Sequence, residues 1–404
     1  MRILFLTSEV PYPARSGGTI KTISVLQHLQ RLHEVEVLCF RRGPLSPEQE
    51  AWTAQIGPVV TVALHRGRSA LNLLRSYGAG VPMSVLRNRS RRMSRLVSER
   101  LASGGFDAAF ADGWLMAQYV PNTFHRLRVL HEHNAEHVMW RRQADLETSF
   151  VRKVLVRMEH GRVRAYESAT IRRFDVVFAV SEEDRRALDE LGPRPGSVRL
   201  LPNVAQAGLL DRPRLQPPAE PTLLFLGTLG WPPNAEGLRR FLRSGFPALR
   251  ARRPDVRLVL AGAGAPSWLV RLASDTSGVE HIGSVSDPEP LYRRARAFVD
   301  VGFGGSGTRV KVLNAMARGL PVVSLPWGVE GLNAVPGVHA LVGRNEAELV
   351  DLLGELLDDD ARWGVLSEGG RGLVRERYVP EIAFASLDAA LAASSDDLTR
   401  YPGQ

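Results

Sequence analysis

The densest group of residues suited to chemistry lies in a glycine-rich loop in the second half of the chain. It runs from Gly302 to Lys311 with the sequence GFGGSGTRVK, and a helix is predicted over Val312–Arg318 directly after it. Glycines let backbone amides approach a ligand closely, and a helix N-terminus favours negative charge. Arg309 and Lys311 add two positive side chains. We therefore predict a site for a di- or triphosphate, lined by Gly304, Gly305, Ser306, Gly307 and Thr308.

The same loop also matches the Gly-x-Gly-x-x-Gly pattern of dinucleotide-binding turns, at Gly302, Gly304 and Gly307. Glu330 follows 23 residues after Gly307, near the spacing of the acidic residue in that motif. That fingerprint normally occupies the first turn of its fold, whereas this loop comes late in the second half. A dehydrogenase is therefore a weaker alternative. Glu330 is equally a candidate for binding sugar hydroxyls or accepting a hydroxyl proton.

A second group of candidate residues is the histidine-rich segment HEHNAEH, which begins at His131. A metal site is one interpretation of three histidines so close together. The segment follows a predicted strand as an extended loop, however, where we expect the histidines to alternate between sides. We therefore predict no metal site.

Alternating β-rich and helical stretches place both groups at the ends of strands, as in parallel α/β layers. In open sheets of this kind, ligands bind beyond the carboxyl ends of the strands. Ser181 is predicted to cap a helix, with Asp184 three residues later. Further helices are expected over 347–357 and 381–393. Strands are predicted over residues 3–7, 35–40, 59–64, 108–111, 128–131, 174–180, 222–226, 256–261, 279–282, 297–301 and 321–325.

The domain organisation follows from a break in this pattern. Residues 205–221 carry four prolines and no periodicity, which favours a linker. We therefore predict an N-terminal domain over 1–204, a C-terminal domain over 222–380, and a helix and tail over 381–404. Two doubly wound domains joined in this way imply a cleft between them.

Composition narrows the classes of function. The chain has 404 residues, a net charge of +9, and Cys39 as its single cysteine, so an internal disulfide and a cysteine-based zinc cluster are excluded. No apolar run is long enough to span a membrane, and the opening residues resemble a strand rather than a signal peptide, so we expect a cytoplasmic protein. Lysine occurs only at Lys21, Lys153 and Lys311, and arginine supplies the other 49 of the 52 basic side chains.

Arginines cluster over residues 87–95 and again over 141–173. Such helices are either solvated faces or a patch for an anionic acceptor or the inner surface of a membrane. Nucleic acid is the least favoured partner, because neither interleaved aromatic residues nor a reading motif accompanies the charge.

Taken in order, the motifs resemble those of the family 4 glycosyltransferases. The stretch GSGTRVKVLNAMARGLPVVS, followed by WGVEGL, is similar to the donor-binding signature of that family. Supporting matches along the chain are SGGTIKTISVLQHLQRLHEVEVL, HEHNAEHVMWRR, AVSEEDRRAL, LLPNV, FLGTLGWPPNAEGLRRFL and HIGSVSDPEPLY. The resemblance implies a GT-B fold, in which two doubly wound Rossmann-like domains face each other across a cleft and a C-terminal helix crosses back to the N-terminal domain.

The resemblance also implies the reaction and the roles of individual residues. A nucleotide-sugar would be the donor, with transfer retaining, independent of metal and without a further cofactor. The acceptor would be a polysaccharide, glycolipid or secondary metabolite. Arg309 and Lys311 would neutralise the diphosphate, and His133 would lie near the transferred sugar. Further donor contacts would come from Gly17, Gly18, Gly283, Ser284, Val285 and Glu330.

Two positions depart from the family pattern of two glutamates separated by seven residues. Ser306 and Asn314 stand there in this chain. The second glutamate grips the ribose in the family, and an asparagine there would hold it without charge assistance. A degenerate protein that binds a nucleotide-sugar or a partner without turnover is therefore the main alternative. An epimerase or phosphorylase on the same fold is another.

Overall fold

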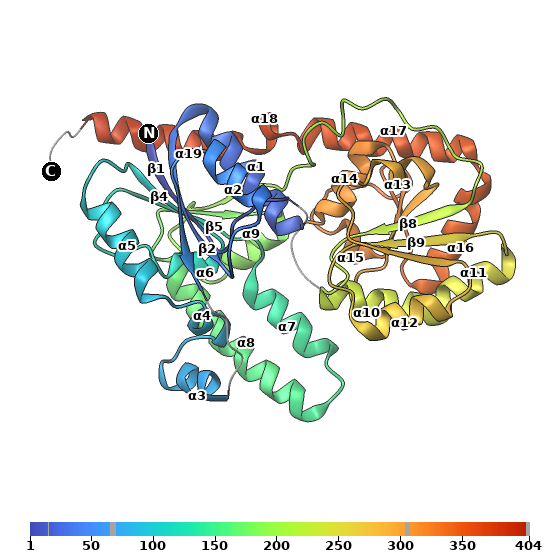
Figure 1. Ribbon diagram of the computed structural model, residues 1–404, viewed down its shortest axis with the longest axis horizontal. Coiled ribbons are helices and arrows are strands. Elements are labelled where there is room, and N and C mark those ends of the chain that lie inside the picture. The colour runs from blue at the N-terminus through green and yellow to red at the C-terminus, as the bar shows by residue number, and fades with distance from the viewer. Residues whose placement is uncertain (15, 65–69, 304–307, 401–404) are drawn as a thin grey trace. The chain divides into compact units, whose positions relative to one another are not determined.

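The computed structural model describes residues 1–14, 16–64, 70–303 and 308–400 and divides into two compact units (Figure 1). The first comprises Met1–Ala14, Gly18–Pro202 and Phe384–Gln404, and the second comprises Arg15–Gly17 and Asn203–Ala383. The first unit is therefore assembled from separate stretches of the sequence. No helix in the described part of the chain is long and apolar enough to span a membrane.

The first unit is built on a seven-stranded parallel sheet with the strand order β3-β2-β1-β4-β5-β6-β7. Residues Ile3 to Leu6 are fully buried, as expected for an apolar strand covered on both faces. The strand order reverses direction at β1, between β2 and β4. The strands are β1 (Arg2–Thr7), β2 (Glu34–Arg41), β3 (Val59–Ala63), β4 (Ala108–Asp112), β5 (Leu127–His131), β6 (Val176–Ala179) and β7 (Val198–Leu200).

Ten helices of the described residues connect or cover this sheet. Ser181 caps α9, accepting a hydrogen bond from the Asp184 backbone N–H, as predicted. The helices are α1 (Gly17–Leu32), α2 (Pro47–Gln55), α3 (Ala70–Gly78), α4 (Met83–Arg87), α5 (Arg91–Ala102), α6 (Trp114–Ala117), α7 (Glu136–Leu146), α8 (Phe150–Ile171), α9 (Glu182–Asp189) and α19 (Ala385–Arg400).

The second unit repeats the design with a six-stranded parallel sheet in the order β10-β9-β8-β11-β12-β13. Its strands are β8 (Thr222–Leu226), β9 (Arg257–Ala261), β10 (Val279–Gly283), β11 (Ala297–Asp300), β12 (Val322–Ser324) and β13 (Leu341–Val342). Its helices are α10 (Pro232–Arg240), the π-helix η1 (Phe241–Gly245), α11 (Phe246–Arg252), α12 (Ser267–Asp275), α13 (Glu289–Arg294), α14 (Val310–Arg318), α15 (Pro326–Val329), α16 (Glu346–Asp358), α17 (Asp360–Arg377) and α18 (Pro380–Ala383). The prediction of two doubly wound parallel sheets is confirmed.

The helix predicted over 381–393 is two helices, α18 and α19, on either side of Phe384. The second of them belongs to the first unit, where Asp388 accepts a hydrogen bond from the His28 ring at 2.8 Å. Phe384 packs its ring against the same histidine, with 5.0 Å between the ring centroids. The predicted return of the C-terminal helix to the N-terminal domain is therefore confirmed.

The segment predicted as a linker, residues 205–221, packs on one unit. Ala205, Leu209 and Leu215 are buried in the core of the second unit. Arg318 and Arg371 also donate hydrogen bonds to carbonyls of this segment. The proline-rich composition therefore marks an irregular but ordered stretch.

Candidate functional site

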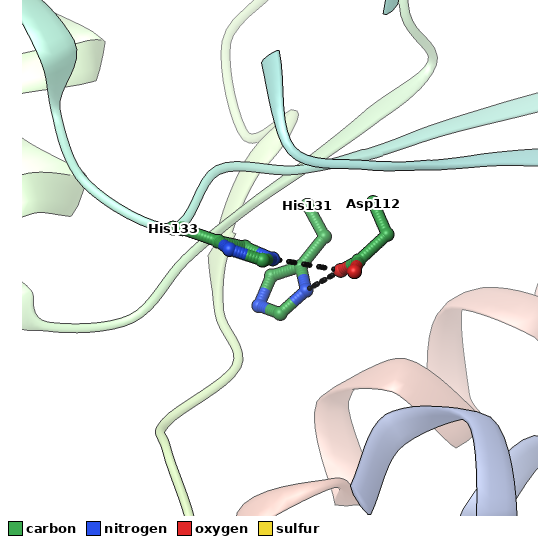
Figure 2. Close-up of side chains that lie close together, drawn as sticks. All are labelled: Asp112, His131 and His133. Atoms are coloured by element: carbon green, nitrogen blue, oxygen red, sulfur yellow. Dashed lines mark hydrogen bonds and ion pairs between the residues drawn. The ribbon is translucent and has the colours of Figure 1, made fainter. Parts of the chain in front are cut away.

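The first unit gathers polar side chains at the carboxyl ends of β4 and β5. Asp112 ends β4 directly opposite His131, which ends β5, and His133 follows two residues later. One oxygen of Asp112, Oδ1, accepts a hydrogen bond from Nδ1 of His131 and another from Nε2 of His133, both at 2.8 Å (Figure 2). The other oxygen accepts from the hydroxyl of Thr22 on α1 at 2.5 Å. A single buried carboxylate therefore orients both imidazoles.

Burial and hydrogen bonding set the charges of this group. Burial opposes ionisation of Asp112, but the two histidines outweigh it and hold the pKa of the carboxyl far below its usual range. Burial lowers the pKa of His131 to about 4, although its bond to Asp112 opposes that shift. At neutral pH His131 is thus a neutral ring that donates from Nδ1. Its Nε2 is buried and has no hydrogen-bond partner among the described residues.

The expectation that these histidines face opposite sides is wrong for His131 and His133. Both rings meet Asp112, because residues i and i+2 of an extended segment share a side. Each of the three residues offers a potential ligand atom within 4.8 Å of the others, and Oδ1 of Asp112 is joined by hydrogen bonds to Nδ1 of His131 and to Nε2 of His133. The third histidine, His137, instead donates to Glu167 at 2.6 Å.

Beside this group lie four buried carboxyl groups, none of which the sequence analysis named as a site residue. Glu167 accepts hydrogen bonds from the backbone N–H groups of Glu136 and His137, and Asp184 accepts from that of Ala135. Burial, reinforced by Glu167 and Asp184, raises the pKa of Glu136 to about 8. Burial also raises the pKa of Glu132, and neither oxygen of that carboxyl has a hydrogen-bond partner within the described residues.

Lys21 connects α1 to the histidine segment. Its ammonium donates to the backbone carbonyl of His133 at 3.1 Å. Its charge also opposes the rise in the Glu136 pKa. The helix α1 begins at Gly17, so Gly17 and Gly18 form its first turn.

The second unit carries its own polar group at the carboxyl end of β11. Asp300 ends this strand and is completely buried. Lys311, in the first turn of α14, places its ammonium 2.8 Å from Oδ1 of Asp300 and 2.8 Å from Oδ1 of Asn234 on α10. The ammonium also lies 4.4 Å from the ring centroid of Phe225. Burial lowers the pKa of Lys311, and the Asp300 charge opposes that shift.

Arg309, Thr308 and Asn314 surround the start of the same helix. Arg309 is its N-cap residue and is half-buried. The carbonyl of Thr308 accepts a hydrogen bond from the side chain of Asn203 at 3.2 Å. Oδ1 of Asn314 accepts a hydrogen bond from the backbone N–H of Gln206 at 2.8 Å. The Asn314 side chain therefore holds the backbone near the beginning of the second unit. The predicted residues from 308 to 314 thus lie together at one helix terminus.

The other predicted donor contacts lie elsewhere in the second unit or outside the residues that the structure describes. Gly283 ends β10 with φ of +79°, and Ser284 and Val285 follow it at the edge of the sheet. Glu330 follows α15 and is half-buried. The predicted residues Gly304, Gly305, Ser306 and Gly307 lie outside the described residues.

Comparison with known proteins matches two families of domain to the two halves of the chain. Residues 17–204 match the glycosyl transferase 4-like domain, and residues 220–359 match the glycosyl transferases group 1 domain. The chain belongs to the group 1, family 4-like glycosyltransferases. This glycosyltransferase is 23% identical over 359 residues to an uncharacterized 44.6 kDa protein in the cps region of Klebsiella pneumoniae, covering 85% of this chain and 88% of that one.

Two relatives of this glycosyltransferase have names that state an activity. It is 28% identical to the phosphatidyl-myo-inositol mannosyltransferase of Mycolicibacterium smegmatis over 246 residues, or 57% of this chain and 60% of that protein. It is 30% identical over 152 residues to a GDP-mannose-dependent monoacylated alpha-(1-6)-phosphatidylinositol monomannoside mannosyltransferase of Corynebacterium glutamicum, covering 35% of this chain and 40% of that protein. In both cases the match spans less than two thirds of the relative.

Solved structures show that this glycosyltransferase has the GT-B fold. Sucrose-phosphate synthase from Thermosynechococcus elongatus has a TM-score of 0.69 at 18% identity, covering 99% of this chain and 98% of that one. HepE of Anabaena, solved in complex with UDP and glucose, has a TM-score of 0.68 at 15% identity, covering 97% of this chain and 99% of that one. The family and fold expected from the sequence are confirmed.

Proposed function

We propose that this glycosyltransferase moves a sugar, with retention and without a metal ion, from a nucleoside-diphosphate sugar to a hydroxyl of a lipid-linked or polysaccharide acceptor. The observation that carries the proposal is the start of α14, where Arg309, Lys311 and the helix N-terminus lie together. The names of the relatives add support: two are mannosyltransferases of phosphatidylinositol compounds, and one protein comes from a cps region.

Departure of the nucleoside diphosphate is the step that this terminus would assist. As the bond from the sugar to the diphosphate breaks, negative charge builds on the phosphate oxygens. Donors placed beforehand where that charge develops stabilise the transition state more than the ground state. Arg309 and the first N–H groups of α14 would supply such donors. Lys311 has three N–H bonds and directs two of them to Asp300 and Asn234, so its third would be the one offered to the diphosphate.

Retention would follow if the acceptor hydroxyl enters on the face from which the diphosphate leaves. The hydroxyl oxygen bonds to the sugar carbon, the carbon–oxygen bond to the diphosphate breaks, and the hydroxyl proton passes to a diphosphate oxygen. No strong protein base is then required. Gly17 and Gly18 would face the diphosphate or the acceptor, Gly283 to Val285 would offer backbone groups to the base, and Glu330 would bind sugar hydroxyls.

His133 would position the transferred sugar in this scheme. Its Nε2 donates to Asp112, which fixes the direction in which the ring would face the sugar. Asp112 acts as the positioning residue, since it fixes the tautomer and the orientation of the ring. We place the reaction in the cytoplasm, at the inner face of the membrane if the acceptor is a lipid.

Calorimetric titration with UDP, GDP, ADP and dTDP tests the donor site. We expect one nucleotide to bind, and Arg309→Ala to weaken that binding at least ten-fold, because one charge-assisted contact to phosphate is lost. Arg344→Ala is the matched control, since Arg344 is a highly exposed arginine of the same unit that pairs with Glu348. Failure of every nucleotide to bind to folded protein would contradict the proposal.

Turnover then separates an enzyme from a protein that only binds nucleotide. Release of nucleotide from the matching sugar donor in the presence of lipid or glycan acceptors supports transfer. Asn314→Glu restores the carboxylate usual in the family and can still accept from the Gln206 N–H. We expect it to tighten nucleotide binding a few-fold. Tight binding with no transfer in either protein would favour the non-catalytic alternative.

A further inference from the structure

The first three turns of α8 expose an apolar stripe on the side of the helix that faces solvent. Its members stand at positions i, i+1, i+4, i+5 and i+8, which share one face of a helix. Their exposed fractions are 80% for Phe150, 67% for Val151, 41% for Val154, 54% for Leu155 and 50% for Met158. We call these five residues the α8 stripe. An ordinary surface helix points its apolar residues inward, so this stripe reverses the usual pattern.

The opposite face of α8 packs against the rest of the first unit. Val163 is fully buried there in a cluster with Val85 and Trp114. Glu159 accepts a hydrogen bond from the Met83 backbone N–H and pairs with Arg162, while Glu167 binds His137. The inner face of α8 is therefore packed through residues other than the five of the stripe.

The exposed charged side chains of α8 are all positive. Its only two acidic residues, Glu159 and Glu167, are buried and engaged as described above. Arg152, Arg157 and Arg164 are exposed, and Lys153 is half-exposed. On a helical projection, Arg152 borders one edge of the stripe, while Lys153 and Arg157 border the other. The outer face of this helix is therefore apolar along its centre and cationic at both edges.

The place of α8 in the first unit leaves this face accessible. In Figure 1, α7 and α8 extend away from the sheet as an antiparallel pair, with the turn between them at the end remote from the strands. Leu146, at the end of α7, is 42% exposed and adjoins that turn. The other exposed large apolar side chains of the described residues occur singly or in twos along the chain. The α8 stripe is therefore the main run of exposed apolar side chains among those that the structure describes in the first unit.

We propose that the α8 stripe inserts into the interface of a membrane containing anionic lipids, with its basic borders on the headgroups. The proposal deepens the proposed function, since it supplies the surface on which a lipid-linked acceptor would be met. Amphipathic helices that lie in the plane of a membrane combine an apolar face with basic residues in this way. A protein partner or a second copy of the chain would need acidic groups facing the stripe, and α8 exposes none itself.

Vesicle flotation tests the proposal without donor or acceptor. We expect the wild-type protein to bind vesicles of phosphatidylglycerol and phosphatidylcholine, to bind phosphatidylcholine alone far less, and to be released by salt. Replacing Phe150, Leu155 and Met158 together by serine should reduce binding at least ten-fold. Glutamine at Arg152, Lys153 and Arg157 should reduce it about a hundred-fold, since each basic residue near an anionic surface contributes about five-fold.

The matched control is Val365→Ser with Ile382→Ser, because these side chains are 59% and 49% exposed in the second unit. This control should bind vesicles as the wild type does. All of these positions are exposed except Lys153, which is half-exposed, so circular dichroism and the melting temperature should change little. Equal vesicle binding by wild type, stripe variant and control would overturn the proposal, as would a wild-type dimer that dissociates in the stripe variant without any binding to vesicles.

Insertion can be observed directly because Cys39, the only cysteine, is completely buried in β2. A polarity-sensitive fluorophore attached to Phe150→Cys should shift its emission to the blue on addition of anionic vesicles. The same fluorophore on Val365→Cys should not shift. Since neither measurement involves a nucleotide, loss of the donor site would leave them unchanged, and their failure would leave the transferase proposal standing.

Discussion

The buried ion pair of Lys311 and Asp300 predicts that Lys311 contributes more to the stability of the fold than Arg309, the other basic residue at the start of α14. Lys311→Met keeps most of the length and apolar stem of the side chain but removes the ammonium. Of the hydrogen-bond donors among the described residues, the fully buried Asp300 carboxylate would then keep the Gly302 backbone N–H alone, at 2.9 Å. Its second oxygen already has no hydrogen-bond partner within the described residues. The substitution therefore leaves a buried charge without compensation.

The size of the effect follows from this uncompensated charge. Removing one partner of a buried ion pair costs about 3–5 kcal/mol, mostly from the desolvated group left behind. The double substitution Lys311→Met with Asp300→Asn removes both charges and keeps an acceptor for the Gly302 N–H. We expect the double variant to lie within about 2 kcal/mol of the wild type. The two changes should thus be strongly non-additive.

Arg309→Ala is the matched comparison, because Arg309 is two residues away but only half-buried and makes no side-chain capping bond. We expect it to cost less than about 1 kcal/mol. Scanning calorimetry, with the transition of the second unit resolved from that of the first, measures the wild type, these three variants and Asp300→Asn alone, which completes the double-mutant cycle. A Lys311→Met variant as stable as Arg309→Ala would refute the reasoning, and so would additive losses in the double variant.

Three further predictions concern stability. The pKa of Glu136 is about 8 in the folded protein, against 4.5 for an ordinary glutamate. Between these two pH values the folded protein keeps a proton that the unfolded chain has lost, so the free energy of unfolding should fall as pH rises from about 4.5 to 8. Glu136→Gln should flatten that decline in urea titrations at pH 6 and pH 8.5. Ser181→Ala removes the N-cap of α9 and should cost about 1 kcal/mol in the same titrations. Gly237→Ala would bring a Cβ to 1.8 Å from the Val301 carbonyl oxygen, so the melting temperature should drop sharply. Gly364→Ala, at an exposed position of α17 with open space around it, should be neutral or slightly stabilising.

The layout of the fold could be predicted from the sequence because its signals are local. Buried parallel strands are continuous apolar runs, and the edges predicted for the strand at 222–226 coincide with those of β8. The missed strands, β7 and β13, have three and two residues, too few for any periodicity to appear. Gly17 and Gly18 begin α1 although glycine disfavours helices, so local propensity does not mark the start of this helix.

The candidate site was less predictable because its contacts join distant parts of the chain. Lys311 stood out as a rare lysine, but its partners Asp300 and Asn234 come from two other elements. Only the sheet order brings these elements together. Asp112 could have been noticed as an acidic residue closing an apolar strand. Its bonds to both histidines depend on the register between β4 and β5, which no local pattern encodes.

The return of α19 to the first unit has a consequence for how this protein is made. The ribosome completes Pro202 and then synthesises the roughly 180 residues of the second unit before Phe384 exists. At about 5–20 residues per second, this interval lasts on the order of 10–40 s. Throughout it, the surface that Phe384, Leu387 and Leu391 later cover remains open to solvent and to chaperones. The unit that starts translation first is thus the one whose folding finishes last.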